Sequence, residues 1–496
     1  MTTDPSPPAA PHLTDKGLRG DSVGLLATIS LGLASVAPAY SIAVTLGLVV
    51  LAVGDLAPAA LVLGFVPILL TAFAFRELNR RMPDCGATFV WTTRVFGPAA
   101  GWLAGGWAVL IATVLVMTTL AQVGATALFA LVGLDAAADD TFAVTALAVV
   151  LLAVTTLVAY RGIQLAAHLQ YAMIGLQLLA LLVFGVAAFA GAGVTTPSAD
   201  WLNPFGFGGW GPFAESVLLS LFIYWGWDAL ITFNEETVDS GRTPGRAAVA
   251  STLILLVTYV FTACAALSFA GTGDTGLGLG NEETAADALT GLAPAVLGDA
   301  LGKVVTLAIA VSAVGALLTG VGAMPRITLS MAAHGALPAA FGRTHPRFLT
   351  PAYGTVYIGC ATAAVLVLLT LVSPDFLGDA VLSIGLLIAF YYGVTGFACV
   401  WYFRAELRRS ARNLLVMGVM PLAGGLMMLA AFARGAYDMT DPDYGSTSAG
   451  GVGGVFLLGI GSIVLGAVVM LLVRVRHRRF FREGRTTVVG PPVTED

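Results

Sequence analysis

The chain has 496 residues, of which 57% are hydrophobic and only 11% are charged, and its mean hydropathy is +0.89. A soluble globular protein carries about 25% charged residues, so this composition excludes a soluble body of this size. The formal net charge of −5 gives no basis for binding nucleic acid.

Apolar stretches of roughly 20 residues recur along the whole chain, which is the length that a helix needs to cross the hydrocarbon core of a bilayer. The core offers no water to an unpaired backbone N–H or C=O, so these stretches should be helices rather than strands. The sequence predicts an all-α membrane protein with 12 transmembrane helices, at 23–51, 56–75, 99–131, 141–159, 166–191, 213–234, 247–271, 298–331, 352–372, 377–403, 413–433 and 451–473.

The spans form one predicted transmembrane transporter domain, 23–473, between two tails. Residues 1–22 are polar and rich in proline at their start, and they predict a disordered cytoplasmic tail rather than a signal peptide. Residues 474–496 begin with a run of arginines and predict a basic cytoplasmic tail. This run either anchors the topology or contacts the anionic head groups of lipids.

The basic residues predict the orientation. With the N-terminus inside, all of the 24 Lys and Arg residues except Lys303 and Arg434 fall on the cytoplasmic side. Acidic residues dominate the other side, namely Asp135, Asp139, Asp140, Asp274, Glu282, Glu283, Asp441 and Asp443. This is the positive-inside asymmetry, and it predicts a multi-pass protein of the cell membrane with both termini in the cytoplasm and segments 192–212 and 272–297 outside.

Two predicted spans are interrupted. The first contains Pro38, and the sixth contains Gly226 between Trp225 and Trp227, directly before Asp228. Proline inside a helix costs about 3 kcal/mol, and a broken helix exposes N–H and C=O groups that can bind a carboxylate or an ammonium group. Breaks at corresponding places in two halves of a transporter point to its binding site. The alternative is a simple kink, which membrane helices tolerate.

Three stretches resemble the amino acid–polyamine–organocation (APC) superfamily of permeases, in the same order and at the same span ends. They are ELNRRMPDCGATFVWTTRVFGPAAGWLAGGW (Glu77 to Trp107), YWGWDALITFNEETVDSGRTPGRAAVAS (Tyr224 to Ser251) and RITLSMAAHGALPAAFGRTHPRFLTP (Arg326 to Pro351). The resemblance implies a 5+5 inverted repeat with broken helices 1 and 6, plus two appended helices. It also implies alternating access to a central site between spans 1, 3, 6, 8 and 10.

The resemblance and the breaks together predict the site. The predicted substrate-binding residues are Ser35, Val36, Ala37, Pro38, Ala39 and Tyr40 in span 1, and Tyr224, Trp225, Gly226 and Trp227 in span 6. Packing against lipid or other helices is the alternative for the aromatic residues, and at most one or two of them can face a cavity. Gln177 and Tyr391 are predicted to support the site.

The chain departs from the family pattern at two places. Many members have Gly-Ser-Gly at the break in span 1, where this chain has Val36, Ala37 and Pro38, so an amine or a modified amino acid stays open beside an α-amino acid. Many relatives also carry a lysine in span 5, where this chain has Gln177. A neutral amide cannot change its charge, so any proton carrier must lie elsewhere.

Asp228 is the predicted proton-coupling residue. An ionisable group far from either end of an apolar span is costly and by default marks a pathway or a relay. Burial disfavours the charged form of a carboxylate, whereas an arriving ammonium group favours it. In the alternative, the carboxylate is paired with backbone donors of the broken helix and has a structural role only.

These features predict a secondary active transporter, or permease, that moves an amino acid or related amine with protons as the coupling ion. HExxH, GxSxG and Walker A motifs do not occur, which argues against an enzyme, and we expect no cofactor and no bound metal. Two alternatives remain: an inorganic-cation carrier of the same fold, and a non-transporting membrane sensor or partner subunit. Glu235 and Glu236, at the predicted cytoplasmic end, are either solvated or part of an ion-paired gate.

Overall fold

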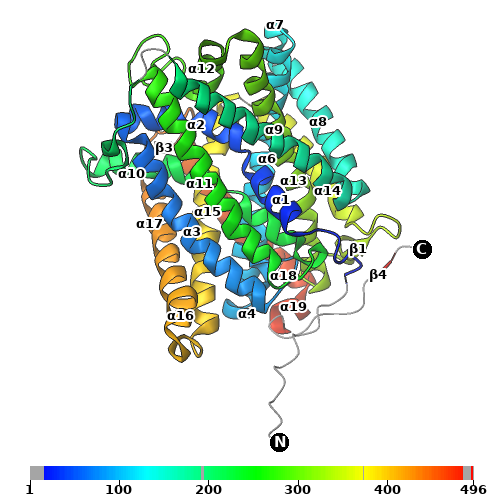
Figure 1. Cartoon of the computed structure of the whole chain (residues 1–496). Helices are drawn as coiled ribbons and strands as arrows, with labels where there is room; N and C mark the ends of the chain where they lie inside the picture. The colour runs from blue at the N-terminus through cyan, green and yellow to red at the C-terminus, as the bar shows by residue number, and fades with distance from the viewer. Residues whose placement is uncertain (1–15, 192–194, 373, 484–492, 495–496) are drawn as a thin grey trace, which may run out of the picture.

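The computed structural model describes residues 16–191, 195–372, 374–483 and 493–494 (Figure 1). Its α-helices are α1 (Leu25–Val36), α2 (Pro38–Val53), α3 (Ala57–Arg81), α4 (Thr88–Phe96), α5 (Pro98–Ala100), α6 (Ala108–Leu131), α7 (Asp135–Ala138), α8 (Thr141–Arg161), α9 (Ile163–Ala190), α10 (Trp210–Phe222), α11 (Thr243–Ala270), α12 (Ala288–Leu297), α13 (Asp299–Ala333), α14 (Ala352–Val372), α15 (Pro374–Phe403), α16 (Ala411–Asn413), α17 (Met420–Asp438), α18 (Gly454–Arg476) and α19 (Arg478–Glu483).

Shorter elements connect or extend these helices. The 3₁₀ helices are Gly54–Leu56, Ala199–Leu202, Trp227–Glu236 (η4), Ala285–Asp287, Ala339–Gly342 and Leu407–Arg409, and the π-helical turns are Gly101–Trp107 and Leu414–Val419. The two-residue strands are β1 (Arg343–Thr344), β2 (Ser448–Ala449), β3 (Val452–Gly453) and β4 (Val493–Thr494). β1 pairs with β4 in parallel, and β2 pairs with β3 antiparallel.

Eleven stretches of the described residues are long and apolar enough to cross a membrane. The first, Leu25–Arg81, is 57 residues long and contains both the first and the second predicted span. Within it, the chain turns at Gly54, where φ is 61°, and α3 returns along the bundle (Figure 1). The protein is therefore a multi-pass membrane protein, while the number of twelve spans and the repeat remain predictions.

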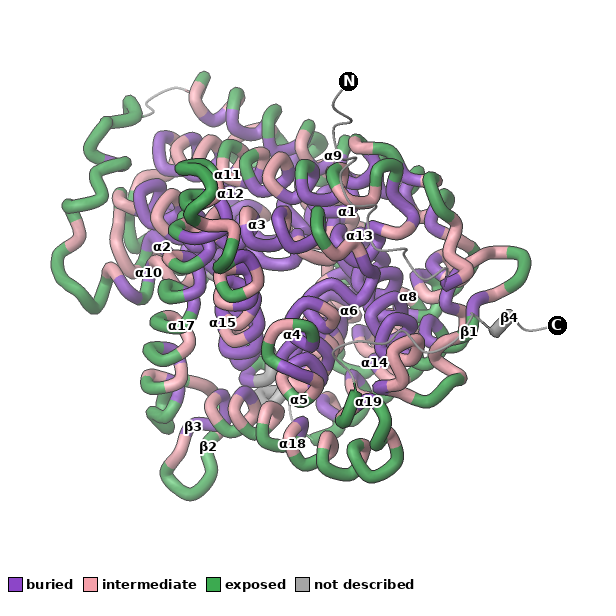
Figure 2. Tube along the Cα trace, turned by 90° about the horizontal axis from the view of Figure 1, so that it is seen from below, coloured by how far each residue is buried: buried purple, intermediate pink, exposed green. Residues whose placement is uncertain are grey.

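Burial separates a core from a periphery. In α13, and in Leu382–Phe403 of α15, 72% of the most apolar stretch is buried inside the protein, whereas the value for α18 is 17%. Seen along the bundle, the buried residues gather around α1, α3, α6, α13 and α15 (Figure 2). Large apolar side chains of α18, such as Leu465 and Leu472, are exposed. A helix that is apolar on its outer face suits contact with lipid.

The two ends of the bundle differ in charge. α7 and α12 lie at one end, which we call the acidic end, and α4, α16 and α19 lie at the opposite, arginine-rich end (Figure 1). Asp135 starts α7, whereas Arg412 lies in α16 and Arg478 starts α19. Which end faces the cytoplasm remains a prediction.

Parts of both predicted tails pack against the arginine-rich end. Residues 1–15, 484–492 and 495–496 lie outside the described residues. The predicted disorder does not extend over residues 16–22, because Lys16 is buried and the N–H groups of Ser22 and Val23 donate to the carbonyl of Glu236, at 2.9 and 3.0 Å. In the second tail, Phe480 of α19 is also buried.

Candidate functional site

The two interrupted helices break where they touch each other. α1 ends at Val36, Ala37 takes a left-handed conformation with φ 54° and ψ 64°, and Pro38 starts α2. A proline disfavours the α-helical conformation of the residue before it, which explains the position of this break. α10 ends at Phe222, and the chain passes through Gly226, with φ 109°, into η4.

The contact between the breaks requires glycine at position 226. A Cβ atom there would lie 2.7 Å from the carbonyl oxygen of Ser35, and the positive φ is itself strained for an L-residue. The hydroxyl of Ser35 also donates to the carbonyl of Gly226, at 2.7 Å. Backbone groups of the two broken helices are therefore held against each other at the centre of the bundle.

Asp228 follows Gly226 by two residues, at the start of η4, and accepts two hydrogen bonds from hydroxyl groups. Its Oδ2 accepts from the hydroxyl of Tyr391 at 3.0 Å, and its Oδ1 accepts from Tyr392 at 2.9 Å. The indole N–H of Trp225 donates in turn to the Tyr391 oxygen, at 2.6 Å. Asp228 forms no ion pair with any side chain in the described part of the chain. Hydrogen bonds thus run from Trp225 through Tyr391 to Asp228, whose carboxyl group has no counter-ion among the described side chains.

A cavity of about 40 Å³ opens beside this carboxylate. Its lining includes Ser35 of α1, Thr113 and Met117 of α6, Trp225 and Asp228 near the second break, Gly320 of α13 and Tyr391 of α15. These elements correspond to predicted spans 1, 3, 6, 8 and 10. A water needs at least ~10–15 Å³ of such space, so the cavity has room for only a few waters and would have to open before an amino acid could enter.

The structure separates the predicted substrate-binding residues into two groups. Ser35, Trp225 and Gly226 line the cavity, together with Asp228 and Tyr391. The four residues at the first break are buried and are not among the lining residues: Val36, Ala37, Pro38 and Ala39. The first break therefore contributes to the cavity through Ser35 alone among these predicted positions.

The remaining aromatic residues point elsewhere. The ring of Tyr224 packs against those of Phe65 and Tyr259, at centroid distances of 5.4 and 5.2 Å. Trp227 packs against Phe75, at 5.1 Å, and does not line the cavity. Of the three aromatic residues around Gly226, only Trp225 faces it.

Gln177 is fully buried in α9, and neither atom of its amide has a hydrogen-bond partner among the described residues. It does not line the central cavity. Its neighbour by two turns, Gln170, donates instead to the carbonyl of Gly315 at 2.7 Å and to Thr319 at 2.9 Å. The described contacts thus link Gln170, rather than Gln177, to α13.

Two larger hollows open at the acidic end. Their volumes are about 1310 and 600 Å³, and Tyr40 and Val44 of α2 line both. Acidic side chains line them as well, including Glu215 and Asp441 in the first and Asp139 and Asp287 in the second. Tyr40 therefore belongs to the boundary of these hollows rather than to the central cavity.

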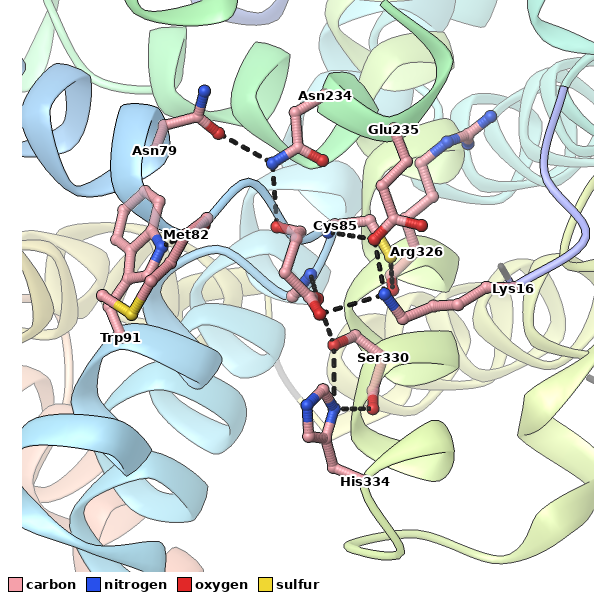
Figure 3. Close-up of polar contacts among 12 residues, drawn as sticks. Lys16, Asn79, Met82, Cys85, Trp91, Asn234, Glu235, Arg326, Ser330 and His334 are labelled. Atoms are coloured by element: carbon pink, nitrogen blue, oxygen red, sulfur yellow. Dashed lines mark hydrogen bonds and ion pairs between the residues drawn. The ribbon is translucent and has the colours of Figure 1, made fainter. Parts of the chain in front are cut away.

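The arginine-rich end is closed by a buried ionic cluster (Figure 3). The ammonium of Lys16 lies 3.0 Å from Oδ2 of Asp84 and 2.5 Å from Oε1 of Glu235. Burial alone would lower the pKa of Lys16, but the two carboxylates raise it above its ordinary value. Burial alone would raise the pKa of Asp84, but Lys16 holds it below its ordinary value. Both groups are therefore charged at neutral pH.

A second buried ion pair lies next to this cluster. The guanidinium of Arg326 binds the carboxylate of Glu236, with 2.9 Å between Nη2 and Oε1, and it lies 4.3 Å above the ring of Phe233. Both glutamates at this end are thus ion-paired rather than solvated. Planar, bidentate contacts of this kind are what a guanidinium forms best with a carboxylate.

One group of described side chains has the spacing of a metal site. Ligand atoms of Asp84, Cys85 and Glu235 lie within 4.8 Å of one another. The ammonium of Lys16 already lies between the two carboxylates, so the chain supplies its own positive charge there. The thiol of Cys85 donates to the carbonyl of Arg326 at 3.3 Å. One ammonium group therefore offsets the charge of one of the two carboxylates.

Sequence reasoning missed Lys16, Asp84, Thr113 and Met117. Lys16 carried no signal, because it lies in a polar segment that looks like a tail. Thr113 and Met117 lie in an apolar span in which several positions are equally compatible with facing a cavity. Asp84 lies in a loop after span 2, and nothing next to it in sequence indicates that it is buried or that Lys16 is its partner.

The fold and the site define a multi-pass membrane protein whose helices enclose a mostly apolar cavity beside the two helix breaks, with the Asp228 carboxylate in its wall. The sequence profile of the amino acid permease family matches residues 23–473. The chain is 26% identical to the branched-chain amino acid permease BcaP of Lactococcus lactis subsp. cremoris over 356 residues, which cover 68% of this chain and 72% of that protein.

Two further relatives match over longer ranges. The serine/threonine exchanger SteT of Bacillus subtilis is 24% identical over 433 residues, 85% of this chain and 92% of that protein. The low-affinity putrescine importer PlaP of Escherichia coli is 23% identical over 426 residues, 83% of this chain and 87% of that protein. The chain belongs to the amino acid permease family, and it is a transporter rather than an enzyme.

Proposed function

We propose that this protein is a secondary active transporter of an amino acid or a related amine, that it binds its substrate between the two helix breaks, and that Asp228 couples transport to protons. The observation that carries the proposal is the Asp228 carboxylate at the junction of the breaks, with hydroxyl groups of Tyr391 and Tyr392 as its partners. The relatives named above are permeases, exchangers or importers of amino acids or of a diamine.

The chemistry of coupling follows from charge balance. A carboxylate in a site of low dielectric constant is stable when it binds a proton or when it pairs with a cation. A substrate ammonium next to Asp228 would be that cation, so proton and substrate compete for the same group. Because such linkage is reciprocal, a bound proton weakens the hold on substrate and bound substrate promotes release of the proton. A proton gradient can then drive cycling.

The first break favours a substrate that binds mainly through its ammonium group. The start of a helix normally offers free N–H groups to a carboxylate. Here Pro38 has no N–H, the N–H of Tyr40 donates to the hydroxyl of Ser312 at 3.3 Å, and that of Ser41 donates to the carbonyl of Ala37 at 2.8 Å. Few donors are left for a substrate carboxylate, which supports an amine or a modified amino acid within the proposed class.

The distribution of space supports alternating access. The central cavity is too small for substrate, the acidic end carries two large hollows, and the arginine-rich end is closed by buried ion pairs. A transporter that opens to one side at a time must pass through such closed states. We place the arginine-rich end and both termini in the cytoplasm on the charge asymmetry of the sequence.

Uptake by the purified protein tests the proposal. Vesicles that contain this chain alone, with and without an inward proton gradient, should accumulate at least one of leucine, serine or putrescine, and the gradient should increase the accumulation. Uptake of inorganic cations without any of these would favour the cation carrier of the same fold. Absence of any uptake, with a protein that is folded, would favour a sensor or a partner subunit.

The orientation has its own test. In a variant without the four native cysteines, a single cysteine at Glu282 or Asp441 should react with an impermeant maleimide added outside intact cells. Protection of both positions would contradict the proposed topology.

A further inference from the structure

Lys16 connects three parts of the chain that are far apart in sequence (Figure 3). Asp84 lies between α3 and α4, Glu235 lies at the end of η4, and Ser330 lies in α13. Lys16 binds Asp84 and Glu235 directly, at 3.0 and 2.5 Å. The other oxygen of Asp84 accepts from the hydroxyl of Ser330 at 2.5 Å. One ammonium group therefore holds all three parts together, directly or through Asp84.

The same three parts close the central cavity on this side. Each contributes a lining residue within about one helical turn of the cluster. Ala87 follows Asp84 by three residues, and Thr232 and Ile327 precede Glu235 and Ser330 by three. The cavity can open toward the arginine-rich end only if these parts separate, and the bonds to Lys16 oppose that separation.

Lys16 is placed so that it can leave without unfolding a helix. Residues 16–22 contain no helix, and the backbone N–H of Ser22 joins them to η4 by donating to the carbonyl of Glu236. The side chain is only 2% exposed, so its withdrawal would leave two carboxylates close together in a buried space. Like charges at such a distance repel, and removal of one partner of a buried ion pair is strongly unfavourable.

We infer that Lys16 is a latch: it holds the cavity closed toward the arginine-rich end, and it withdraws when the cavity opens there. The inference rests on the proposed function, because a latch has a role only in a protein whose cavity opens to this side. It assigns a transport role to a residue outside the predicted transmembrane domain.

Cys85 provides a native reporter. Its thiol is fully buried, and its N–H donates to Oε1 of Glu235 at 2.9 Å, so it becomes accessible when the latch opens. Cys399 is also fully buried but lies in α15, away from the cluster, and reports on general unfolding. Maleimide labelling of the full-length protein in lipid vesicles, followed by mass spectrometry, measures both thiols in one sample.

Lys16→Met keeps most of the length of the side chain and removes its charge, so labelling of Cys85 should become at least about tenfold faster, while Cys399 stays protected. Arg19→Met is the matched control, since it removes a positive charge from the same segment, where Arg19 contacts Gln164 rather than the cluster. It should leave both rates unchanged. Adding Glu235→Gln to Lys16→Met removes the repulsion between carboxylates and should slow Cys85 labelling again.

Two results would overturn the latch. One is labelling of Cys85 in the Lys16→Met variant at the wild-type rate. The other is simultaneous labelling of Cys85 and Cys399, which would show that Lys16 stabilises the fold as a whole rather than the closed state of the cavity. Neither result contradicts the proposed function if vesicles with the wild-type protein take up substrate. If these vesicles take up none, the labelling rates still show whether Lys16 keeps Cys85 inaccessible.

Discussion

The two helix breaks touch each other but bring different chemistry to the centre of the protein. The break at Ala37 is built from small apolar residues and a proline, and it reaches the cavity through Ser35. The break at Gly226 places an indole and a carboxylate, those of Trp225 and Asp228, beside the cavity. The first break therefore shapes the cavity, and the second places a carboxylate beside it. The two breaks are alike in geometry, but the side chains next to them differ in what they could bind.

Gly226→Ala should have the largest effect on this arrangement. The new methyl group would lie 2.7 Å from the carbonyl oxygen of Ser35 at a φ of 109°, and a strained backbone of this kind costs about 1–3 kcal/mol before any clash is counted. Transport should fall by about tenfold to a hundredfold, measured as initial uptake by vesicles. Gly175→Ala, in α9 where a Cβ meets no atom within 4 Å, should transport normally. Normal transport by Gly226→Ala would mean that the breaks need not touch.

Removing a tyrosine hydroxyl near the second break should lower substrate affinity only where that hydroxyl contacts Asp228. Tyr392→Phe removes a donor from Asp228, and a hydrogen bond to a charged group is worth about 1.5–3 kcal/mol. Substrate affinity, measured by thermal shift or by competition for uptake, should fall by about tenfold or more. Tyr224→Phe is the control, because its hydroxyl has no hydrogen-bond partner among the described residues. Equal losses in both variants would show that aromatic packing, rather than the hydroxyl on Asp228, sets the affinity.

Ser35→Ala should have the smallest effect. It removes the hydroxyl that bonds to the carbonyl of Gly226 at 2.7 Å, but it leaves the backbone contact in place. A neutral hydrogen bond contributes about 0.5–1.5 kcal/mol, so transport should fall by a few-fold at most. A loss as large as that of Gly226→Ala would contradict this comparison, because it would mean that the Ser35 hydroxyl of the first break contacts the substrate directly.

The membrane-spanning helices and the two helix breaks could be predicted because their signals are local. A run of about twenty apolar residues indicates a membrane span. Pro38 indicates one break, and Gly226 indicates the other. Asp228 was visible because a carboxylate inside an apolar span is rare and costly. The structure places it beside the cavity, next to both breaks.

The remaining features depend on contacts between distant residues. Nothing near Tyr224 or Trp227 in sequence shows that they turn away while Trp225 faces the cavity, because the chain through Gly226 sets their directions. Lys16 contacts Asp84 and Glu235, which are 68 and 219 residues away in sequence. A periodic sequence pattern does not predict contacts over such separations. Its polar surroundings in sequence predict a solvated tail, whereas the structure buries it.

Asp228→Asn tests the central claim most directly. The amide keeps the shape of the side chain but can neither bind nor release a proton at neutral pH. In vesicles with a proton gradient, the variant should lose gradient-driven accumulation and the pH dependence of uptake, while exchange of substrate for substrate can persist. Accumulation against the substrate gradient with the wild-type pH profile would contradict the account and leave Asp228 a structural role only.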